Sequence, residues 1–174
     1  MNNFIPDIYV KNIYTIDYKK LKSDGIKCIL FDLDNTIVPI DEKEPNKEIK
    51  ELFAYLDDLN LKVIILSNSK KKRVAPFKEI LNVDSSCLSF KPLKHKYKKI
   101  LKMFNYDISE VAAVGDQILT DVFGANRVGL TSIFVDKLKE EDKLFTRINR
   151  KFEKIILNSL KKKGVYDKEN YYGN

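Results

Sequence analysis

The chain alternates between short apolar runs and segments in which apolar residues recur every three or four positions. The apolar runs predict strands at 27–32, 63–66, 87–90, 111–114 and 131–135. The periodic segments predict helices at 17–21, 48–60, 70–81, 94–105 and 116–127. Strands that alternate with helices in this way are typical of an α/β fold in which a parallel sheet is sandwiched by helices.

The first of these strands ends on two carboxylates. Side chains alternate along an extended segment, so Asp32 and Asp34 point the same way while Leu33 turns back into the core. Two converging carboxylates are costly unless a positive charge lies between them, and a divalent cation with a phosphate meets that need. In such a site Asp32 is the candidate nucleophile and Asp34 the candidate acid/base.

Polar groups also follow the later strands. They are Ser67 with Asn68, Lys91 before a proline, and Gly115-Asp116 with Asp121 five residues further on. Because ligands of open parallel sheets bind beyond the carboxyl ends of the strands, we expect these groups to share one site. Ser67 offers a hydroxyl to a phosphoryl oxygen, Lys91 adds positive charge against a transferred phosphate, and Asp116 adds an oxygen ligand suited to Mg²⁺.

In this order the residues resemble the four motifs of the haloacid dehalogenase (HAD) superfamily, beginning with Asp32-x-Asp34-x-Thr36. The chain further resembles the YqeG group of subclass IIIA phosphatases, from about Phe4 to Gly164. The segments that carry this second resemblance are Phe4–Val10, Gly115–Asp121, Gly124–Gly129 and Phe145–Arg150. Related proteins include the fungal mitochondrial phosphatidylglycerophosphate phosphatase. The resemblance implies a Rossmann-like HAD fold and a Mg²⁺-dependent phosphomonoesterase that forms an aspartyl-phosphate.

The resemblance also implies roles for individual residues. The catalytic residues would be Asp32, Asp34, Ser67 and Lys91, and the metal ligands Asp32, Asp34 and Asp116, with Asp34 using its backbone carbonyl. Asp121 and Thr36 would hold these catalytic and metal-binding groups in position without contacting substrate. Asn68, Arg73 and Arg127 would bind substrate. Arg127 stands at a predicted helix end, so capping of the last carbonyls is an equal alternative for it.

Many relatives insert a cap domain after the first or the second motif, and this chain has no room for one. Thr36 and Ser67 are 31 positions apart, Ser67 and Lys91 are 24 apart, and each interval is filled by one helix and one strand. An open site suits a phosphate carried on something large, such as a macromolecule or a membrane. We divide the chain into an N-terminal segment (1–26), a capless core (27–140) and a basic amphipathic helix and tail (141–174).

The predicted C-terminal helix, at 143–163, combines an apolar stripe with many basic residues. The stripe consists of Leu144, Phe145, Ile148, Phe152, Ile155, Ile156 and Leu160. The basic residues are Lys143, Arg147, Arg150, Lys151, Lys154, Lys161, Lys162 and Lys163, and Glu153 alone opposes them. Basic amphipathic helices lie on anionic bilayers. The alternative is that the stripe packs on the core and the lysines form a solvated face.

Composition narrows the class of protein. With 174 residues, 44% hydrophobic and 33% charged, the chain predicts one globular domain. A formal charge of +7 indicates an anionic partner, but no nucleic-acid motif is present. There is no transmembrane stretch or secretory signal, and Cys28 and Cys87 fit buried, reduced thiols. We therefore expect a cytoplasmic protein that can contact the inner face of the membrane peripherally.

Three functions are consistent with the sequence. The leading one is dephosphorylation of phosphatidylglycerophosphate at the membrane surface. The alternatives are a phosphatase of a soluble metabolite or nucleotide, and a basic binding protein with little turnover. The presence of Asp32, Asp34, Lys91 and Asp116 favours an enzyme over a binding protein.

Overall fold

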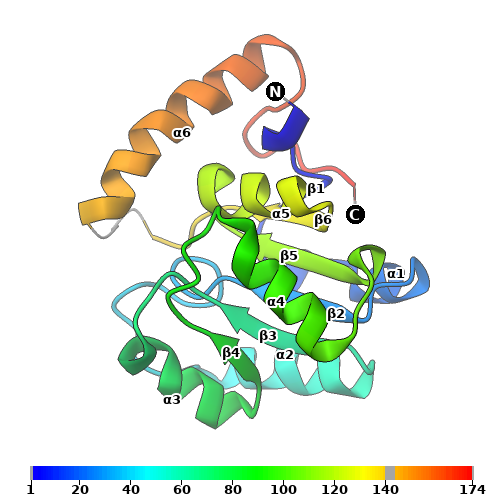
Figure 1. Ribbon diagram of the computed structural model, residues 1–174. Helices are drawn as coiled ribbons and strands as arrows, with labels where there is room; N and C mark the ends of the chain where they lie inside the picture. Colours follow the sequence, from blue (N-terminus) through cyan, green and yellow to red (C-terminus); the bar gives the residue numbers. More distant parts are fainter. Residues whose placement is uncertain (1, 140–143, 174) are drawn as a thin grey trace.

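A computed structural model describes residues 2–139 and 144–173, with only the backbone described for residues 2 and 144–149. Its centre is a parallel sheet with helices on both faces (Figure 1). The strands are β1 (Ile8–Val10), β2 (Cys28–Phe31), β3 (Lys62–Leu66), β4 (Asp84–Ser86), β5 (Val111–Gly115) and β6 (Thr131–Val135). Their order across the sheet is β1-β6-β5-β2-β3-β4, which confirms the predicted α/β fold.

Helices connect the strands and cover the sheet. They are α1 (Tyr18–Ser23), α2 (Lys47–Asp58), α3 (Lys71–Leu81), α4 (Lys94–Phe104), α5 (Phe123–Val128) and α6 (Leu144–Lys162). A π-helical turn, Ile118–Val122, precedes α5, and short 3-10 turns lie at Asn2–Phe4, Ile13–Thr15 and Ile108–Glu110. One helix lies between β2 and β3 and one between β3 and β4, so these connections contain no cap domain.

The two faces of the sheet bury different cores. In β2, Ile29 and Phe31 pack on the side of α2 and α3, whereas Cys28 and Leu30 pack on the side of α4 and α5. All four side chains are buried because the central strand is covered on both faces, and this explains why its sequence is a continuous apolar run. The burial of Cys28 raises the pKa of its thiol to about 12 and keeps it protonated.

The structure corrects the sequence prediction in two places. The predicted strand at 87–90 is wrong, because β4 ends at Ser86 and Leu88 and Phe90 have φ angles of 46° and 53°. The alternation of apolar and serine residues in this segment imitates a half-buried strand. The predicted N-terminal segment contains β1, which pairs with β6 at the edge of the sheet. The outer side of β1 is covered by Tyr172, whose backbone exchanges two hydrogen bonds of 2.9 Å with Tyr9.

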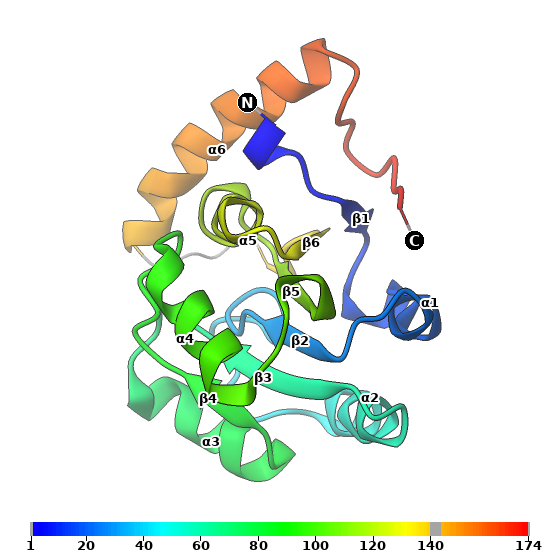
Figure 2. The same ribbon diagram turned by 45° about the vertical axis from the view of Figure 1, so that its right-hand side comes forward.

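Helix α6 crosses the β1–β6 side of the molecule, as Figures 1 and 2 both show. Leu160 is buried, and Ile156 and Leu157 pack against a cluster that contains Tyr9 and Phe134. The other side of the helix exposes Phe152 (59%) and Ile155 (66%). Part of the predicted stripe therefore packs on the core, part faces solvent, and its first three residues lie outside the described side chains. None of the helices in the described residues is both long and apolar enough to span a membrane.

Candidate active site

The site lies at the carboxyl ends of the strands, where Asp32 directly follows β2. The backbone N–H of Asp32 continues the sheet with a 2.9 Å bond to the carbonyl of Val114. Leu33 points into the core, and Asn35 turns the chain with a φ of 65°. Asparagine tolerates this left-handed conformation better than most residues. The carboxylate of Asp34 accepts hydrogen bonds from Ser69 Oγ at 2.6 Å and Arg73 Nε at 2.9 Å.

Lys91 reaches into the site from the connection between β4 and α4. Its Nζ lies 2.6 Å from Asp32 Oδ1 and 2.6 Å from Asp121 Oδ1, and its side chain is 3% exposed. Burial lowers the pKa of Lys91, but the carboxylates of Asp121 and Asp32 outweigh burial and raise the pKa overall. Lys91 is therefore a fixed cation. We name Lys91, Asp32 and Asp121 the Lys91 corner.

Asn68 holds the backbone around Lys91 in place. Its Oδ1 accepts hydrogen bonds from the Lys91 N–H at 2.8 Å and the Ser89 hydroxyl at 2.9 Å, and its Nδ2 donates to the Lys91 carbonyl at 3.3 Å. Ser67 is buried, and its Oγ accepts from the N–H of Ser69 at 3.1 Å. Asn68, two positions beyond the end of β3, thus fixes the backbone of Lys91 in the connection after β4. The role of Asn68 in binding substrate remains a prediction.

Asp116 enters the same cluster from the end of β5. One carboxylate oxygen each of Asp32, Asp116 and Asp121 can be chosen so that all lie within 4.8 Å of one another, and all three residues are buried. Thr36 Oγ1 donates to Asp116 Oδ1 at 3.2 Å. A Cβ built on Gly115 would lie 2.3 Å from Asp121 Cγ, so this position accepts no larger residue without a shift of Asp121. Glycine at position 115 is thus required for Asp121 to lie this close to Asp32 and Asp116.

Helix α6 contributes a second cation that the sequence analysis did not place in the site. Arg150 Nη1 donates to the Asp116 carbonyl at 2.7 Å and to Glu153 Oε2 at 2.6 Å, and Nη2 donates to Asp116 Oδ2. Glu153 is buried and also accepts from the N–H of Ile118. We name Arg150, Asp116 and Glu153 the Arg150 corner. In the sequence, Arg150 is one of many basic residues of the tail, and Glu153, the single acid among them, was the available signal.

Two of the buried acids have strongly shifted pKa values. Burial, with smaller contributions from Asp121 and Asp34, raises the pKa of Asp32 to about 7 against the opposing charge of Lys91. Burial, with Asp32 and Asp121, raises the pKa of Asp116 to about 8 against the opposing charge of Arg150. Burial removes the water that would stabilise the charge of each carboxylate, so a bound cation would favour their ionised forms.

The donor set of the cluster fits a hard divalent cation. It consists of carboxylate oxygens, which are the ligands that Mg²⁺ prefers, and it contains no histidine or cysteine among the described residues. Two protein cations, Lys91 and Arg150, already compensate part of the negative charge. The residues therefore fit one bound divalent ion between Asp32 and Asp116.

The remaining predicted residues lie further out. Arg73 pairs with Asp34 and donates to the backbone carbonyl of Pro39 at 3.4 Å. Arg127 lies in the last turn of α5, with its guanidinium 5.3 Å from the ring centre of Phe123. The structure thus brings Arg73 to the edge of the site and does not bring Arg127 to the acidic cluster. Binding of substrate by these arginines remains a prediction.

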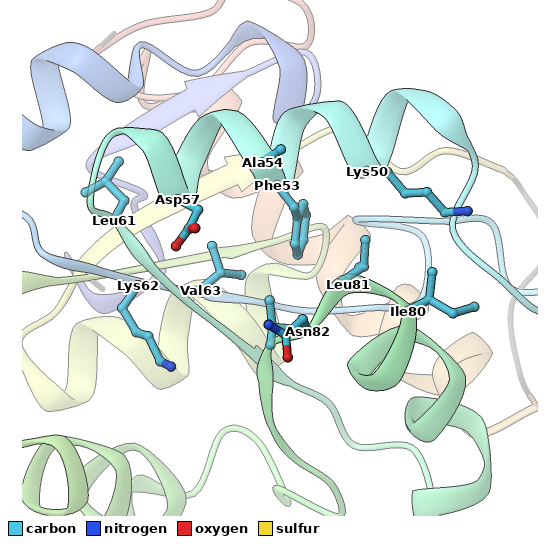
Figure 3. A pocket seen from close by; sticks show the side chains of 11 residues that line it. Lys50, Phe53, Ala54, Asp57, Leu61, Lys62, Val63, Ile80, Leu81 and Asn82 are labelled. Carbon is cyan, nitrogen blue, oxygen red and sulfur yellow. The ribbon is translucent and has the colours of Figure 1, made fainter.

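A separate hollow lies at the opposite edge of the sheet, between α2 and the end of α3 (Figure 3). It borders Phe53, Leu81 and Lys62, and Lys62 is the first residue of β3. None of the groups described above lines it. The chemistry of this protein is therefore concentrated at the carboxyl edge.

The fold and the strand-end residues define a phosphoric monoester hydrolase of the HAD superfamily. More narrowly, the chain belongs to the mitochondrial PGP phosphatase family, whose model matches residues 1–138. "Probable phosphatase YqeG" of Bacillus subtilis is 37% identical over 161 residues, which cover 92% of this chain and 94% of that protein. "Phosphatidylglycerophosphate phosphatase 1, chloroplastic/mitochondrial" of Arabidopsis thaliana is 26% identical over 92% of this chain. The match spans about half of the plant protein, 49% of its length.

Solved structures confirm the fold. The cobalt-bound deoxy-D-mannose-octulosonate 8-phosphate phosphatase of Haemophilus influenzae matches with a TM-score of 0.55 at 15% identity, over 84% of this chain and 95% of that one. The D,D-heptose 1,7-bisphosphate phosphatase of B. bronchiseptica, complexed with magnesium and phosphate, matches with a TM-score of 0.51 at 19% identity. The match covers 63% of this chain and 80% of that one. Both comparisons support the HAD architecture.

Proposed function

We propose that this protein is a Mg²⁺-dependent phosphomonoesterase that dephosphorylates phosphatidylglycerophosphate at the membrane surface through an aspartyl-phosphate on Asp32. The observation that carries the proposal is the Lys91 corner, a buried carboxylate beside a fixed cation in a pocket of further acids. The lipid substrate is supported by the family match and by the name of the Arabidopsis relative, a phosphatidylglycerophosphate phosphatase. The open, capless site supports a phosphate carried on a large body.

Asp32 is the nucleophile in this proposal. An Asp32 oxygen forms a bond to phosphorus while the bond from phosphorus to the leaving oxygen breaks, and water later cleaves the aspartyl-phosphate to release phosphate. Lys91 holds Asp32 in position and places a positive charge beside the phosphoryl oxygens. Ser67 offers a hydroxyl hydrogen bond to one of these oxygens. A divalent ion held by Asp32, Asp116 and the backbone carbonyl of Asp34 would neutralise charge on the transferred group.

Asp34 is the proposed acid/base, two residues beyond the nucleophile. Both of its carboxylate oxygens accept hydrogen bonds, one from Arg73 and one from Ser69. Each carboxylate oxygen can accept a second hydrogen bond, so Asp34 can exchange a proton with the leaving oxygen while these contacts hold it. Arg73 then keeps Asp34 oriented towards the substrate. Thr36 and Asp121 orient Asp116 and Lys91 in the same way.

Phosphate release from a panel of substrates tests this proposal. The panel contains phosphatidylglycerophosphate in detergent micelles, nucleotides and sugar phosphates, each with Mg²⁺ and with a chelator. We expect Mg²⁺-dependent release that is fastest for the lipid and is lost in Asp32→Asn, which keeps the size of the side chain. Faster release from a soluble metabolite would replace the lipid substrate, and turnover by Asp32→Asn would remove Asp32 as the nucleophile.

A further inference from the structure

Three large apolar side chains stand exposed on the short connection that carries Lys91. Leu88 is 44% exposed, Phe90 59% and Leu93 56%, whereas Lys91 between them is buried. Single exposed apolar residues are ordinary on protein surfaces. Three within six positions, around the lysine of the active site, are uncommon and need an explanation. We name Leu88, Phe90 and Leu93 the apolar loop.

The backbone of the apolar loop disfavours the residues that it carries. Leu88 and Phe90 have φ angles of 46° and 53°, a region in which glycine and asparagine are far more common than large apolar residues. Leu93 occupies the N-cap of α4 and makes no capping hydrogen bond, where serine or asparagine is preferred. Among the described residues, burial of these three side chains does not offset the unfavourable backbone. Local conflicts of this kind are typical of functional sites.

Hydrogen bonds fix the loop to the site beneath it. The N–H of Leu88 donates to the Ser69 carbonyl at 3.0 Å, that of Ser89 to the Ser67 carbonyl at 3.1 Å, and that of Leu93 to the Phe90 carbonyl at 2.9 Å. Asn68 holds Lys91 in the same network. The exposed side chains are therefore one to three residues away from an anchored catalytic lysine. Whatever they contact is brought close to Asp32.

The surroundings of the apolar loop are strongly basic. Segments 59–78 and 85–106, which include α4 and most of α3, contain twelve lysine or arginine residues and no aspartate or glutamate. The N-terminal ends of both helices adjoin the loop, with Lys70, Lys71 and Lys72 on one side and Lys94 and Lys96 on the other. A rim of cations around exposed apolar side chains matches an anionic surface with an apolar interior.

We propose that the apolar loop inserts into an anionic lipid bilayer and thereby presents the active site to phosphate headgroups. This inference rests on the proposed lipid substrate and names the surface that meets it. A bilayer is favoured over a second copy of the chain because the flanking basic segments would face each other in a symmetric dimer. Their like charges would repel, whereas anionic headgroups would attract them.

Helix α6 adds a second contact to the same bilayer. Through Arg150, which pairs with Asp116, it reaches the same acidic cluster as Lys91. Further along α6, Phe152 and Ile155 are exposed, and Lys151 and Lys154 next to them are exposed too. Arg150 points inward to Asp116 and is not part of this face. The helix thus contributes through its lysines and outer apolar residues while its inner side stays on the core.

A double variant, Phe90→Asn with Leu93→Ser, tests the apolar loop directly. Both replacements suit the local backbone, so the fold should be kept. The matched control is Met103→Ser, because Met103 is 62% exposed near the other end of α4. Each protein is mixed with phosphatidylcholine vesicles that either contain or lack phosphatidylglycerol, and the bound fraction is measured by flotation at low and high salt. Hydrolysis of a soluble aryl phosphate reports on folding.

We expect the wild type and Met103→Ser to bind anionic vesicles alike, and the double variant to bind at least about tenfold more weakly. All three should hydrolyse the aryl phosphate at similar rates, and binding should fall as salt rises. Equal binding by the double variant, or no binding by the wild type, would overturn the docking surface even if lipid in micelles is hydrolysed. If the wild type forms a dimer and the double variant does not, the apolar loop is a self-association surface and the membrane proposal is overturned. Failure to hydrolyse the lipid in any form would remove the proposed substrate, while the flotation result would still decide whether the loop docks.

Discussion

Two buried cations reach the same acidic cluster from different parts of the chain. Lys91 comes from a loop at the carboxyl edge of the sheet and pairs with Asp32 and Asp121. Arg150 comes from α6, on the β1 side of the molecule, and pairs with Asp116 and Glu153. The Lys91 corner carries the proposed nucleophile, whereas the Arg150 corner engages an oxygen that a metal ion would use. In the proposed function the first cation would assist the chemistry, and the second would compete with a bound metal ion.

Removing Lys91 should have the largest effect on activity. In Lys91→Met, Asp32 and Asp121 lose their shared cation, and loss of one partner from a buried ion pair costs about 3–5 kcal/mol. We expect at least about a thousandfold loss of kcat on an aryl phosphate, because the phosphoryl oxygens also lose a fixed positive charge. Steady-state kinetics at saturating Mg²⁺ measure the effect. Turnover within tenfold of wild type would show that Arg150 can replace Lys91.

Adding one methyl group at Gly115 should disturb the Lys91 corner alone. In Gly115→Ala the new Cβ clashes with Asp121, the partner of Lys91, and overpacking of this kind costs about 1–3 kcal/mol. We expect a lower Tm and reduced kcat, with little change in Mg²⁺ affinity, because Asp116 and Arg150 are not displaced. Thermal unfolding and calorimetric titration with Mg²⁺ separate these outcomes. An unchanged Tm would mean that Asp121 is free to move.

Removing Arg150 should strengthen metal binding. Arg150→Ala frees Oδ2 and the backbone carbonyl of Asp116, and a charged hydrogen bond contributes about 1.5–3 kcal/mol. We expect Mg²⁺ to bind about tenfold more tightly, as measured by titration calorimetry, with kcat at saturating Mg²⁺ nearly unchanged. Lys154→Ala, one turn along on the exposed face, is the control. Weaker Mg²⁺ binding in Arg150→Ala would instead assign Arg150 the task of orienting Asp116.

The two corners should also share a pH dependence that Mg²⁺ removes. Asp32 and Asp116 have pKa values of about 7 and about 8 when folded without metal, against about 4 in an unfolded chain. The folded protein therefore binds more protons, and without metal its stability should fall as pH rises from about 4 to about 8. Mg²⁺ replaces these protons, so the rise in Tm that it causes should grow with pH. A rise that is constant over this range would contradict the burial of both charges.

Much of the fold and the Lys91 corner could be predicted because the residues follow strong local patterns. Asp32 and Asp116 each directly follow an apolar run that forms a strand, and the geometry of parallel strands gathers such positions at one edge. Lys91 was predicted from the order of the motifs, because the apolar run before it is not a strand. Arg150 could not be found in this way, because it stands on a helix among other basic residues and its partner Asp116 is 34 positions away. Likewise β1 has only three residues, and its pairing with β6 is a contact over more than a hundred positions.

The pairing of Tyr9 with Tyr172 bears on how the chain reaches this fold during synthesis. An open strand edge offers its backbone to other chains and promotes aggregation. Strand β1 leaves the ribosome before the other strands of the sheet, and the segment that covers its outer edge is made 163 residues later. At a synthesis rate of about 5–20 residues per second, that edge has no native cover for about ten to thirty seconds. Nascent chains of this protein should therefore depend on chaperones that shield extended segments near their N-terminus, and shortened chains that lack residues 171–173 should keep that dependence after release.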